Sequence, residues 1–466
     1  QNTNYKSLWK KVDKSVENFL PQQAEKDLLK IEEIATKEDN KPQLIRVALY
    51  RLSINNIYQE DNDIKNINFI TKKVEENQTP IKNIYYSILG NLYYNYLEYN
   101  RYTIGNKVNV DSDSDDITSW SREDILNKIY YCYLKSVEDI DVLKNINLND
   151  YKVILREEEN ENRKYLPTLY DFLAYNAIKI LENPENNPLD QKIINKEALS
   201  SFNYFIKADI DGSYSFSENM VDVLQLYQNI LKNNVDNATV FINADLSRLK
   251  FVYSNTDLEN KDELYLNALF NLERRYPQHP DIANIMYDIA NFYYENAQKY
   301  DGDVSDDYKD YFSLALAYCE KAVKDHPDSR GGKGCKYLKD KITESVISNI
   351  KFDKIIYPKE YFPIHIEYKN CESIYYKIVS ISFDDLINLS LKYYNVNNKF
   401  VKEYLKKPLV KSDKIDIPSS DDYRVHNTEL IIPALEEGSY LIFVSNNKDF
   451  DYDKGYLASS TFQVSD

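Results

Sequence analysis

The stretch Phe362-Pro363-Ile364-His365-Ile366-Glu367-Tyr368-Lys369 decides the fold class, because its apolar side chains recur at every second position. This alternation is typical of a β-strand with one buried face. Pro363 lacks a backbone N–H donor and therefore favours an edge strand. Upstream of this stretch the apolar residues follow a helical period instead. The sequence therefore predicts a chain that changes from helices to strands near residue 345.

Residues 346–466 predict a β-sandwich, because short candidate strands recur between turn residues. Besides the first stretch, the candidates are Ile350–Ile356, Ile374–Ile381, Glu429–Pro433, Ser439–Val444 and Tyr456–Val464. Glu437-Gly438 separates two of them and predicts a hairpin turn. Ser382–Leu405 fits either an inserted helix or a long connection, and both alternatives stay open.

Residues 1–345 predict an all-α helical-repeat region. Apolar side chains recur with the i, i+3, i+4, i+7 spacing of amphipathic helices in segments that begin at Tyr85, Ile125, Leu169, Ile282 and Phe312. Ser121, with Asp124 three residues later, is the predicted N-cap of the second segment.

A loose repeat marks the end of the helical region. His279-Pro280-Asp281 recurs as His326-Pro327-Asp328, each time between a helical segment with basic residues at its end and a new one. This pattern predicts helical pairs of the tetratricopeptide type, with residues 300–307 as a polar insert. Small residues favour close helix approach at Ala315, Ala317 and Ala322. The glycine cluster 331–334 precedes a last helix predicted from about Cys335 to Ser345.

The composition excludes several classes of function. With 58 Lys and Arg against 75 Asp and Glu, the net charge is −17, which makes nucleic acid a poor partner. The 9 glycines disfavour folds that need Gly-rich phosphate loops, so no cofactor is expected. No apolar run reaches the roughly 20 residues of a membrane-spanning helix, so no membrane span is expected.

No motif predicts a catalytic, cofactor-binding or metal site. The run Asp111–Asp115 resembles a calcium loop, but Asp116 and Arg122 stand where that loop needs Gly and Glu. The alternating acids from Asp449 to Asp453 lack the Gly as well and predict a strand-turn loop. The histidines are scattered, and residues 157–159 are a solvated acidic run. We therefore expect a protein that is not an enzyme, and a helical-barrel hydrolase with two facing carboxylates is the alternative.

The cysteines and tyrosines have structural interpretations. Cys132, Cys319, Cys335 and Cys371 form no CxxC and are expected to be free thiols in cores, although a Cys319–Cys335 disulfide stays open. Tyrosines cluster at residues 93–102 and 130–133. At helical spacing such clusters favour packing over a binding surface.

Several stretches resemble one family. They are Asp116-Ile117-Thr118-Ser119-Trp120-Ser121, Tyr151–Leu155, Leu166–Ala177, Gly438–Val444 and Ala458–Val464. Together they are similar to the amino-terminal region of Bacteroidetes-type alpha-2-macroglobulin family proteins, in which a helical region precedes fibronectin-like macroglobulin domains. The order of parts agrees with helices over 1–345 and a macroglobulin-like sandwich over 346–466.

The resemblance implies protease trapping by a longer parent protein. Covalent trapping in this family uses a thioester in a C-x-E-Q motif, and none of the four cysteines begins one. The chain is therefore expected to be a non-catalytic scaffold, with endopeptidase inhibition in later domains and an envelope protein as a further partner of the helices. The chain begins at Gln1 without Met, so we expect a removed signal peptide and an exported, periplasmic, cell-envelope or secreted location. The alternative is a free-standing tetratricopeptide-like envelope protein that binds peptides.

Overall fold

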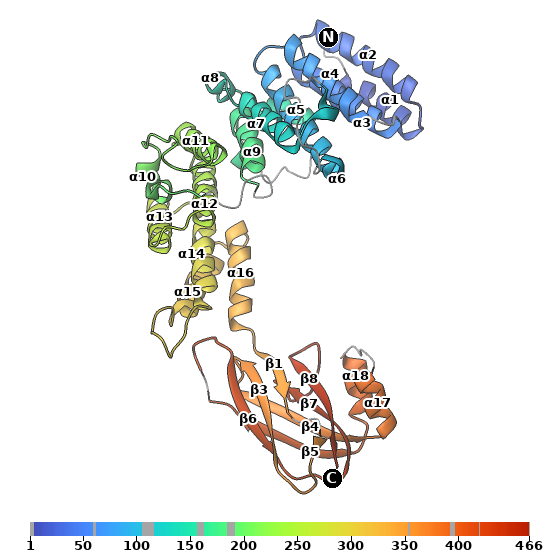
Figure 1. Cartoon of the computed structure of the whole chain (residues 1–466), viewed down its shortest axis with the longest axis vertical. Helices are drawn as coiled ribbons and strands as arrows, with labels where there is room; N and C mark the ends of the chain where they lie inside the picture. The colour runs from blue at the N-terminus through green and yellow to red at the C-terminus, as the bar shows by residue number, and fades with distance from the viewer. Residues whose placement is uncertain are drawn as a thin grey trace. The chain divides into compact units, whose positions relative to one another are not determined.

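A computed structural model describes residues 4–58, 62–104, 116–155, 163–183, 192–352, 355–391, 397–418 and 420–465. The chain divides into two compact units, Gln1–His279 and Pro280–Asp466 (Figure 1). Helices fill the first unit, whereas the second contains the last helices and all the described strands. The predicted fold class, helices followed by a β-sandwich, is confirmed.

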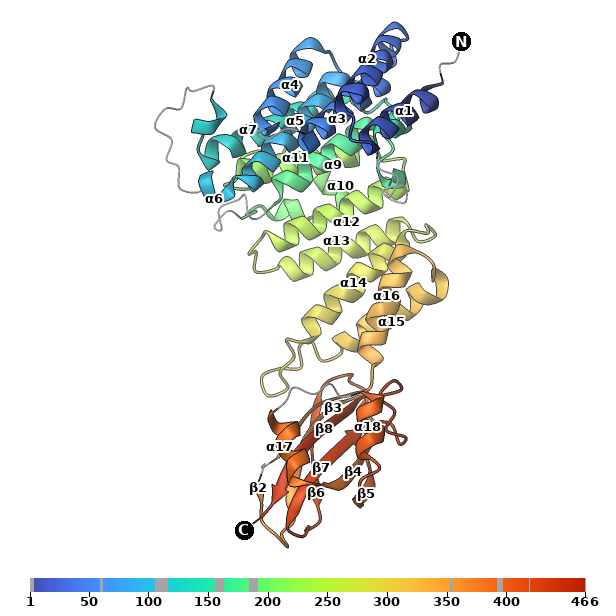
Figure 2. The same cartoon turned by 90° about the vertical axis from the view of Figure 1, so that its right-hand side faces the viewer.

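The first unit is an array of helices in which sequence neighbours lie side by side (Figure 2). Its α-helices are α1 (Tyr5–Glu17), α2 (Pro21–Lys37), α3 (Lys41–Tyr58), α4 (Asn62–Glu76), α5 (Ile81–Tyr99), α6 (Arg101–Ile104), α7 (Arg122–Ser136), α8 (Ile140–Leu143), α9 (Leu169–Leu181), α10 (Phe202–Phe205), α11 (Glu218–Asn233), α12 (Ala238–Ser254) and α13 (Lys261–Arg275). Short 3₁₀ helices are η1 (Ile117–Ser119), η2 (Leu148–Ile154) and η5 (Lys196–Leu199). The predicted helical-repeat region is confirmed at this level.

Local sequence explains where these helices begin. The predicted N-cap Ser121 is confirmed: its hydroxyl accepts from the Asp124 N–H at 3.2 Å, and the Asp124 carboxylate accepts from the Ser121 N–H at 2.9 Å. This reciprocal pair satisfies backbone donors that a helix start would otherwise leave without partners. Trp120, just before the cap, stacks on Tyr93 of α5 with ring centroids 6.0 Å apart.

The second unit begins with three packed helices, α14 (Ile282–Ala297), α15 (Tyr311–Asp325) and α16 (Arg330–Thr343). The strands are β1 (Val346–Lys351), β2 (Ile355–Ile356), β3 (Phe362–Lys369), β4 (Ser373–Ile381), β5 (Leu409–Asp416), β6 (His426–Ile432), β7 (Gly438–Ser445) and β8 (Leu457–Val464). They form a three-stranded sheet, β1-β3-β6, and a five-stranded sheet, β2-β8-β7-β4-β5. Every pair is antiparallel except β2–β8. Alternate residues of both sheets meet in one core, as a sandwich requires.

Two helices settle the segment that the sequence left open. Between β4 and β5 lie α17 (Phe383–Leu391) and α18 (Asn398–Tyr404), on the outer face of the larger sheet (Figure 1). Leu389 and Val401 from these helices pack against Leu441 and Phe443 of β7. Because both faces of β7 are thereby covered, nearly all its residues are buried.

Three strand predictions need correction. β5 was missed, because its residues are mostly exposed and polar, as suits an edge strand protected from pairing. Pro363 does not mark an edge strand, since β3 lies between β1 and β6. The β1 ladder ends at Lys351–His365, so the missing Pro363 donor costs no bond on that side. Glu437-Gly438 is not a hairpin turn, because β6 and β7 belong to different sheets.

Two helix predictions also need correction. α16 begins at Arg330, so Gly331, Gly332 and Gly334 lie within it and do not precede it. The Ser329 hydroxyl caps this start by accepting from the Gly332 N–H at 2.9 Å. Ala315 is buried where helices approach, but Ala317 is exposed.

The passage from α16 to β1 is closely bonded to the sandwich. The Asn370 side-chain amide donates to the carbonyls of Ile342 at 2.8 Å and Glu344 at 3.0 Å. The Asn446 amide donates to the Ser345 carbonyl at 2.9 Å. These bonds satisfy carbonyls that the end of a helix leaves without partners. The change from helix to strand falls here, while the predicted domain boundary at 345/346 stays a prediction.

Arg424 makes a second connection within this unit. Its guanidinium donates to the carbonyls of Ala297 at 2.7 Å and Tyr308 at 2.9 Å, on the α14–α15 connection. It also lies 4.4 Å from the centre of the Tyr300 ring and 5.1 Å from that of Phe312. One side chain of the sandwich thus joins the helices through hydrogen bonds and cation–π contacts.

Candidate functional site

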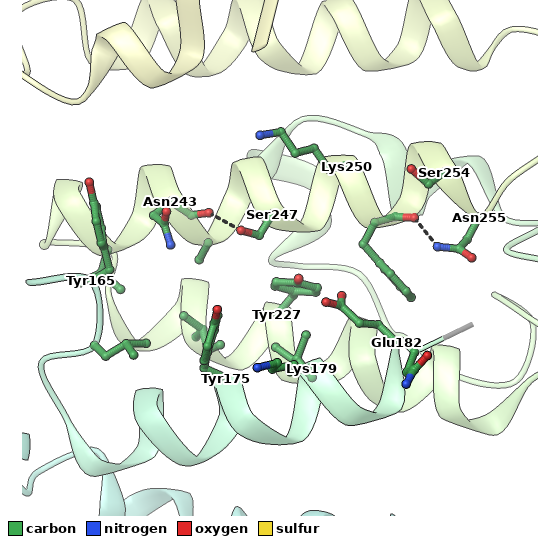
Figure 3. A pocket seen from close by; sticks show the side chains of 17 residues that line it. Tyr165, Tyr175, Lys179, Glu182, Tyr227, Asn243, Ser247, Lys250, Ser254 and Asn255 are labelled. Atoms are coloured by element: carbon green, nitrogen blue, oxygen red, sulfur yellow. Dashed lines mark hydrogen bonds between the residues drawn. The ribbon is translucent and has the colours of Figure 1, made fainter. Parts of the chain in front are cut away.

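A groove of about 840 Å³ lies between α9, α11 and α12 in the first unit (Figure 3). α9 and α12 form its walls, and Tyr227 and Ile230 of α11 lie between them. About half of the lining side chains are apolar or aromatic, and the others carry amide, hydroxyl or charged groups. A concave apolar surface with a few polar groups is the usual form of a ligand site in a protein.

The wall formed by α9 is held at its first turn. Thr168 and Asp171 form a capping box like that of α7, with the Thr168 hydroxyl donating to Asp171 at 2.7 Å. The other oxygen of Asp171 accepts from the Asn234 amide at 2.9 Å, and Asn234 is the C-cap of α11. The buried Asp171 carboxylate therefore ties the start of α9 to the end of α11.

The wall formed by α12 is held by a buried ion pair. The side chains of Arg248 and Asp245 are both 0% exposed, with 2.6 Å between nitrogen and oxygen. The Arg248 guanidinium also donates to the carbonyls of Ala198 at 2.6 Å and Ser200 at 3.1 Å. It lies over the ring of Phe205, 4.2 Å from its centre. These contacts hold α12 through two residues that do not line the groove.

Glu182, Tyr227 and Phe251 all line the groove, and Glu182 lies toward the end where Ser254 and Asn255 lie (Figure 3). Burial raises the pKa of the Glu182 carboxyl, and a hydrogen bond from the Tyr227 hydroxyl offsets part of that rise. The rings of Tyr227 and Phe251 lie with centroids 6.2 Å apart and planes tilted by 40°. This part of the groove thus combines one carboxylate with two aromatic side chains.

The rest of the groove is less acidic. Tyr165, Tyr175 and Asn243 lie toward the other end, and Ser247 of α12 lies between them and Glu182 (Figure 3). The lysines are Lys179 and Lys250, both exposed. Of the described residues that line the groove, Glu182 is the single acid. The carboxylate pair that the hydrolase alternative requires is therefore not found among these lining residues.

The sequence did not predict this site. One signal was available: Glu182 follows the apolar stripe of α9 directly, and an acid at a helix C-terminus opposes the helix dipole. The partner residues of Glu182 lie on helices distant in sequence, so no local motif could identify them.

The histidines take separate places. The His365 ring lies 3.3 Å from Glu429, and the His426 ring lies 2.9 Å from Asp422. His279 lies 3.4 Å from the Thr239 hydroxyl, and His326 is the C-cap of α15. Within the described ranges, no three His, Cys, Asp or Glu side chains come together as metal ligands would.

The acidic runs and cysteines are also placed. Asp451 and Asp453 lie in the β7–β8 loop, where both accept from the Asn398 amide, so the predicted strand-turn loop is confirmed. The calcium-like run 111–115 and the acids 157–159 lie outside the described residues. All four cysteines are free and buried. Cys319 and Cys335 are neighbours, since a hydrogen bond between their side chains raises the pKa of Cys335 together with burial.

Only some tyrosines of the two clusters are buried in helix packing. Tyr93, Tyr96 and Tyr133 are buried, as predicted for helix packing. Tyr99 and Tyr102 are 79% and 93% exposed. None of these side chains lines the groove.

No protein-family model matches this chain, and no curated protein is significantly similar to it. Among solved structures, one match is the Pseudomonas fluorescens alkylpurine DNA glycosylase AlkC bound to DNA containing an abasic site analog. It shares 8% sequence identity over 74% of this chain and 88% of the other, with a TM-score of 0.14. At that TM-score the likeness carries no argument about fold or function. None of the described helices is long and apolar enough to cross a membrane.

Proposed function

We propose that this chain is the non-catalytic amino-terminal scaffold of an exported alpha-2-macroglobulin-like protease inhibitor. In this proposal the longer parent protein traps the protease with its later domains. The supporting observation is the order of parts, a helical array followed by a β-sandwich, in the order that the resembling stretches imply.

The resembling stretches have structural roles, which suits a family signature. Trp120 precedes α7 and Ser121 is its N-cap, while Thr168 and Asp171 form the capping box at the start of α9. Tyr151 is buried in η2. Residues that set helix starts and packing support a shared architecture, whereas catalytic activity would need a different set of residues.

The test is the mass of the native protein. An antibody raised against this chain is used on blots of fractionated source cells. The proposal predicts a band several times larger than 54.9 kDa in the envelope or secreted fraction. That full-length protein should then protect a large substrate from an added protease. A band near 54.9 kDa would contradict the proposal.

A second candidate function is peptide binding by a free-standing envelope protein. The groove between α9, α11 and α12 favours it, because about 840 Å³ accommodates several side chains. Substitution of Ser247, which is half-buried in the groove wall, by Trp would fill the space. Loss of peptide binding by S247W, with unchanged binding by the exposed-site variant Val304→Trp and unchanged thermal unfolding of both, would support this function.

A further inference from the structure

The Glu182 end of the groove carries more negative charge than its one carboxylate. Glu182 is the C-cap of α9, so its side chain is attached where that helix ends. α12 also ends there, since Ser254 is its last residue and Asn255 its C-cap, and both line the groove. A helix C-terminus carries a partial negative charge, equivalent to roughly half an electron. The C-terminal ends of α9 and α12 and the Glu182 carboxylate thus lie at the same half-buried end of the groove.

At the α12 end the Lys261 ammonium donates to the Thr256 carbonyl at 3.1 Å, whereas no described cation forms an ion pair with the Glu182 carboxylate. The hydrogen-bond partner of Glu182 is the neutral Tyr227 hydroxyl. Lys250 points away from Glu182, and Lys179 lies beside Tyr175 (Figure 3). A half-buried carboxylate without a counter-ion is unfavourable, and a bound cation would relieve it.

The aromatic neighbours favour the same kind of ligand. Tyr227 donates a hydrogen bond to the Glu182 carboxylate, and Phe251 lines the same groove with its ring centre 6.2 Å from that of Tyr227, so two aromatic rings with their π faces lie in this part of the groove. An ammonium or guanidinium group is attracted to such faces within about 6 Å of the ring centre. A carboxylate near aromatic side chains is therefore suited to a cationic side chain.

The size of the groove indicates that the cation belongs to a polypeptide. About 840 Å³ is far more than one amine needs, and the lining also includes Ile178 and Ile230 as well as Tyr165 and Tyr175, which lie away from Glu182 (Figure 3). These apolar and aromatic walls fit the residues that flank a basic side chain in a peptide. The net charge of −17 also attracts basic partners over longer distances.

We propose that this end of the groove binds the side chain of a lysine or arginine that a segment of a partner protein presents. The flanking apolar residues of that segment lie along the groove toward Tyr165 and Tyr175. The inference deepens the second candidate function, on which it rests, by naming the chemistry that the peptide must carry.

The test uses the full chain and libraries of acetylated, amidated hexapeptides. One position is fixed as Lys, Arg, acetyl-lysine or norleucine, and binding is measured by fluorescence polarisation. We expect the Lys or Arg libraries to bind about tenfold tighter than the norleucine library, as one charge-assisted contact gives. Acetyl-lysine should bind like norleucine, because it keeps the length of lysine but not the charge. Equal binding of all four libraries would overturn the inference while leaving peptide binding intact.

Three variants test whether Glu182 and Phe251 cause the preference for Lys and Arg. Glu182→Gln keeps the shape of the side chain and should remove the preference for Lys and Arg, whereas Glu75→Gln, an exposed site on α4, should retain it. Phe251→Leu should reduce the preference severalfold. Thermal unfolding checks that each variant is folded. The inference is overturned if E182Q still prefers the Lys and Arg libraries over the norleucine library. It is also overturned if cadaverine alone binds as tightly as the peptides do. Absence of binding by every library contradicts the second candidate function as well.

Discussion

Arg248 places a full charge in the helical core, where solvent does not reach it or Asp245. Contacts with the Asp245 carboxylate, two backbone carbonyls and the Phe205 ring compensate the guanidinium for the loss of its hydration. Such an arrangement depends on the planar fork of arginine, because a lysine ammonium cannot donate in three fixed directions from one plane. Arg248 thereby holds α12, one wall of the groove, against Ala198, Ser200 and Phe205.

Arg248→Lys should therefore destabilise the first unit. We expect a loss of about 3 kcal/mol in the free energy of unfolding, because the buried carboxylate and carbonyls lose their donors. Chemical denaturation monitored by circular dichroism measures it. Lys250→Arg, on the exposed side of the same helix, is the control and should change stability by less than about 0.5 kcal/mol. A near-neutral R248K would show that α12 is held by its apolar contacts alone.

Asp222 gives a prediction about pH. Burial, together with the nearby Glu218, raises the pKa of Asp222 to about 6. Because the folded state holds this proton more tightly than the unfolded state, stability increases as the pH falls from above 6 toward about 4. Asp222→Asn should thus stabilise the protein by about 2 kcal/mol at pH 7.5 and have almost no effect near pH 4. Thermal unfolding at both pH values, with the exposed Asp209→Asn as control, tests this, and an equal effect at both values would contradict it.

At the scale of elements, α14 and α16 touch backbone to backbone. A Cβ added at Gly331 would lie 2.1 Å from the Ala283 carbonyl, far inside van der Waals contact. A Cβ at Gly334 would lie 2.8 Å from the Tyr287 ring. Gly331 and Gly334 therefore allow the close approach of α14, which outweighs their low helix propensity.

Gly331→Ala should lower the free energy of unfolding of the second unit by about 2–3 kcal/mol, because the helices must separate to admit the methyl group. Gly212→Ala is the matched control, since nothing lies within 4 Å of the added Cβ. It should be neutral or slightly stabilising. Denaturation curves that show equal effects of G331A and G212A would mean that the helix contact gives way easily.

The thiols give a second prediction for elements. All four cysteines are buried, and burial raises the pKa of Cys132 to about 12 and also raises that of Cys371. Thiolate, the reactive form, is scarce under these conditions. Ellman's reagent at pH 8 should therefore find almost no reactive thiol in the folded protein and four in denaturant. Two thiols in denaturant would indicate that the Cys319–Cys335 pair had been oxidised.

A helix or strand can be predicted from the sequence when one of its faces is buried and the other is exposed. Long helices and the β3 alternation were predictable, because one face of each lies in a core and imposes a period. β5 has no such period, since almost all of it faces solvent. The groove could not be predicted, because Glu182, Tyr227 and Phe251 meet only through the packing of three helices. The tertiary contact that admits Gly331 is equally invisible to local patterns.

At the scale of the whole molecule, the compact unit Pro280–Asp466 unites α14–α16 with the sandwich. The reason is specific: Asn370, Asn446 and Arg424 all donate to backbone carbonyls of the helices or of the passage to β1. Removing residues 280–345 would take these carbonyl acceptors away from the three side chains.

We expect the fragment 280–466 to be more stable than the fragment 346–466. Each lost bond contributes about 1 kcal/mol, so the thermal midpoint of the shorter fragment should be lower by more than about 5 °C. Arg424→Ala in the longer fragment should reproduce part of that decrease. Equal midpoints for both fragments would show that the sandwich is independent of α14–α16.

The bonded passage between α16 and β1 has a mechanical consequence. Only Glu344 and Ser345 separate the helix from the strand, and side chains of the sandwich hold the carbonyls of both. A flexible tether would lengthen under tension before it transmitted force. Because hydrogen bonds hold this short connection, a force applied along β1 is transmitted directly to α16. The strand and the helix then move together as one rigid element.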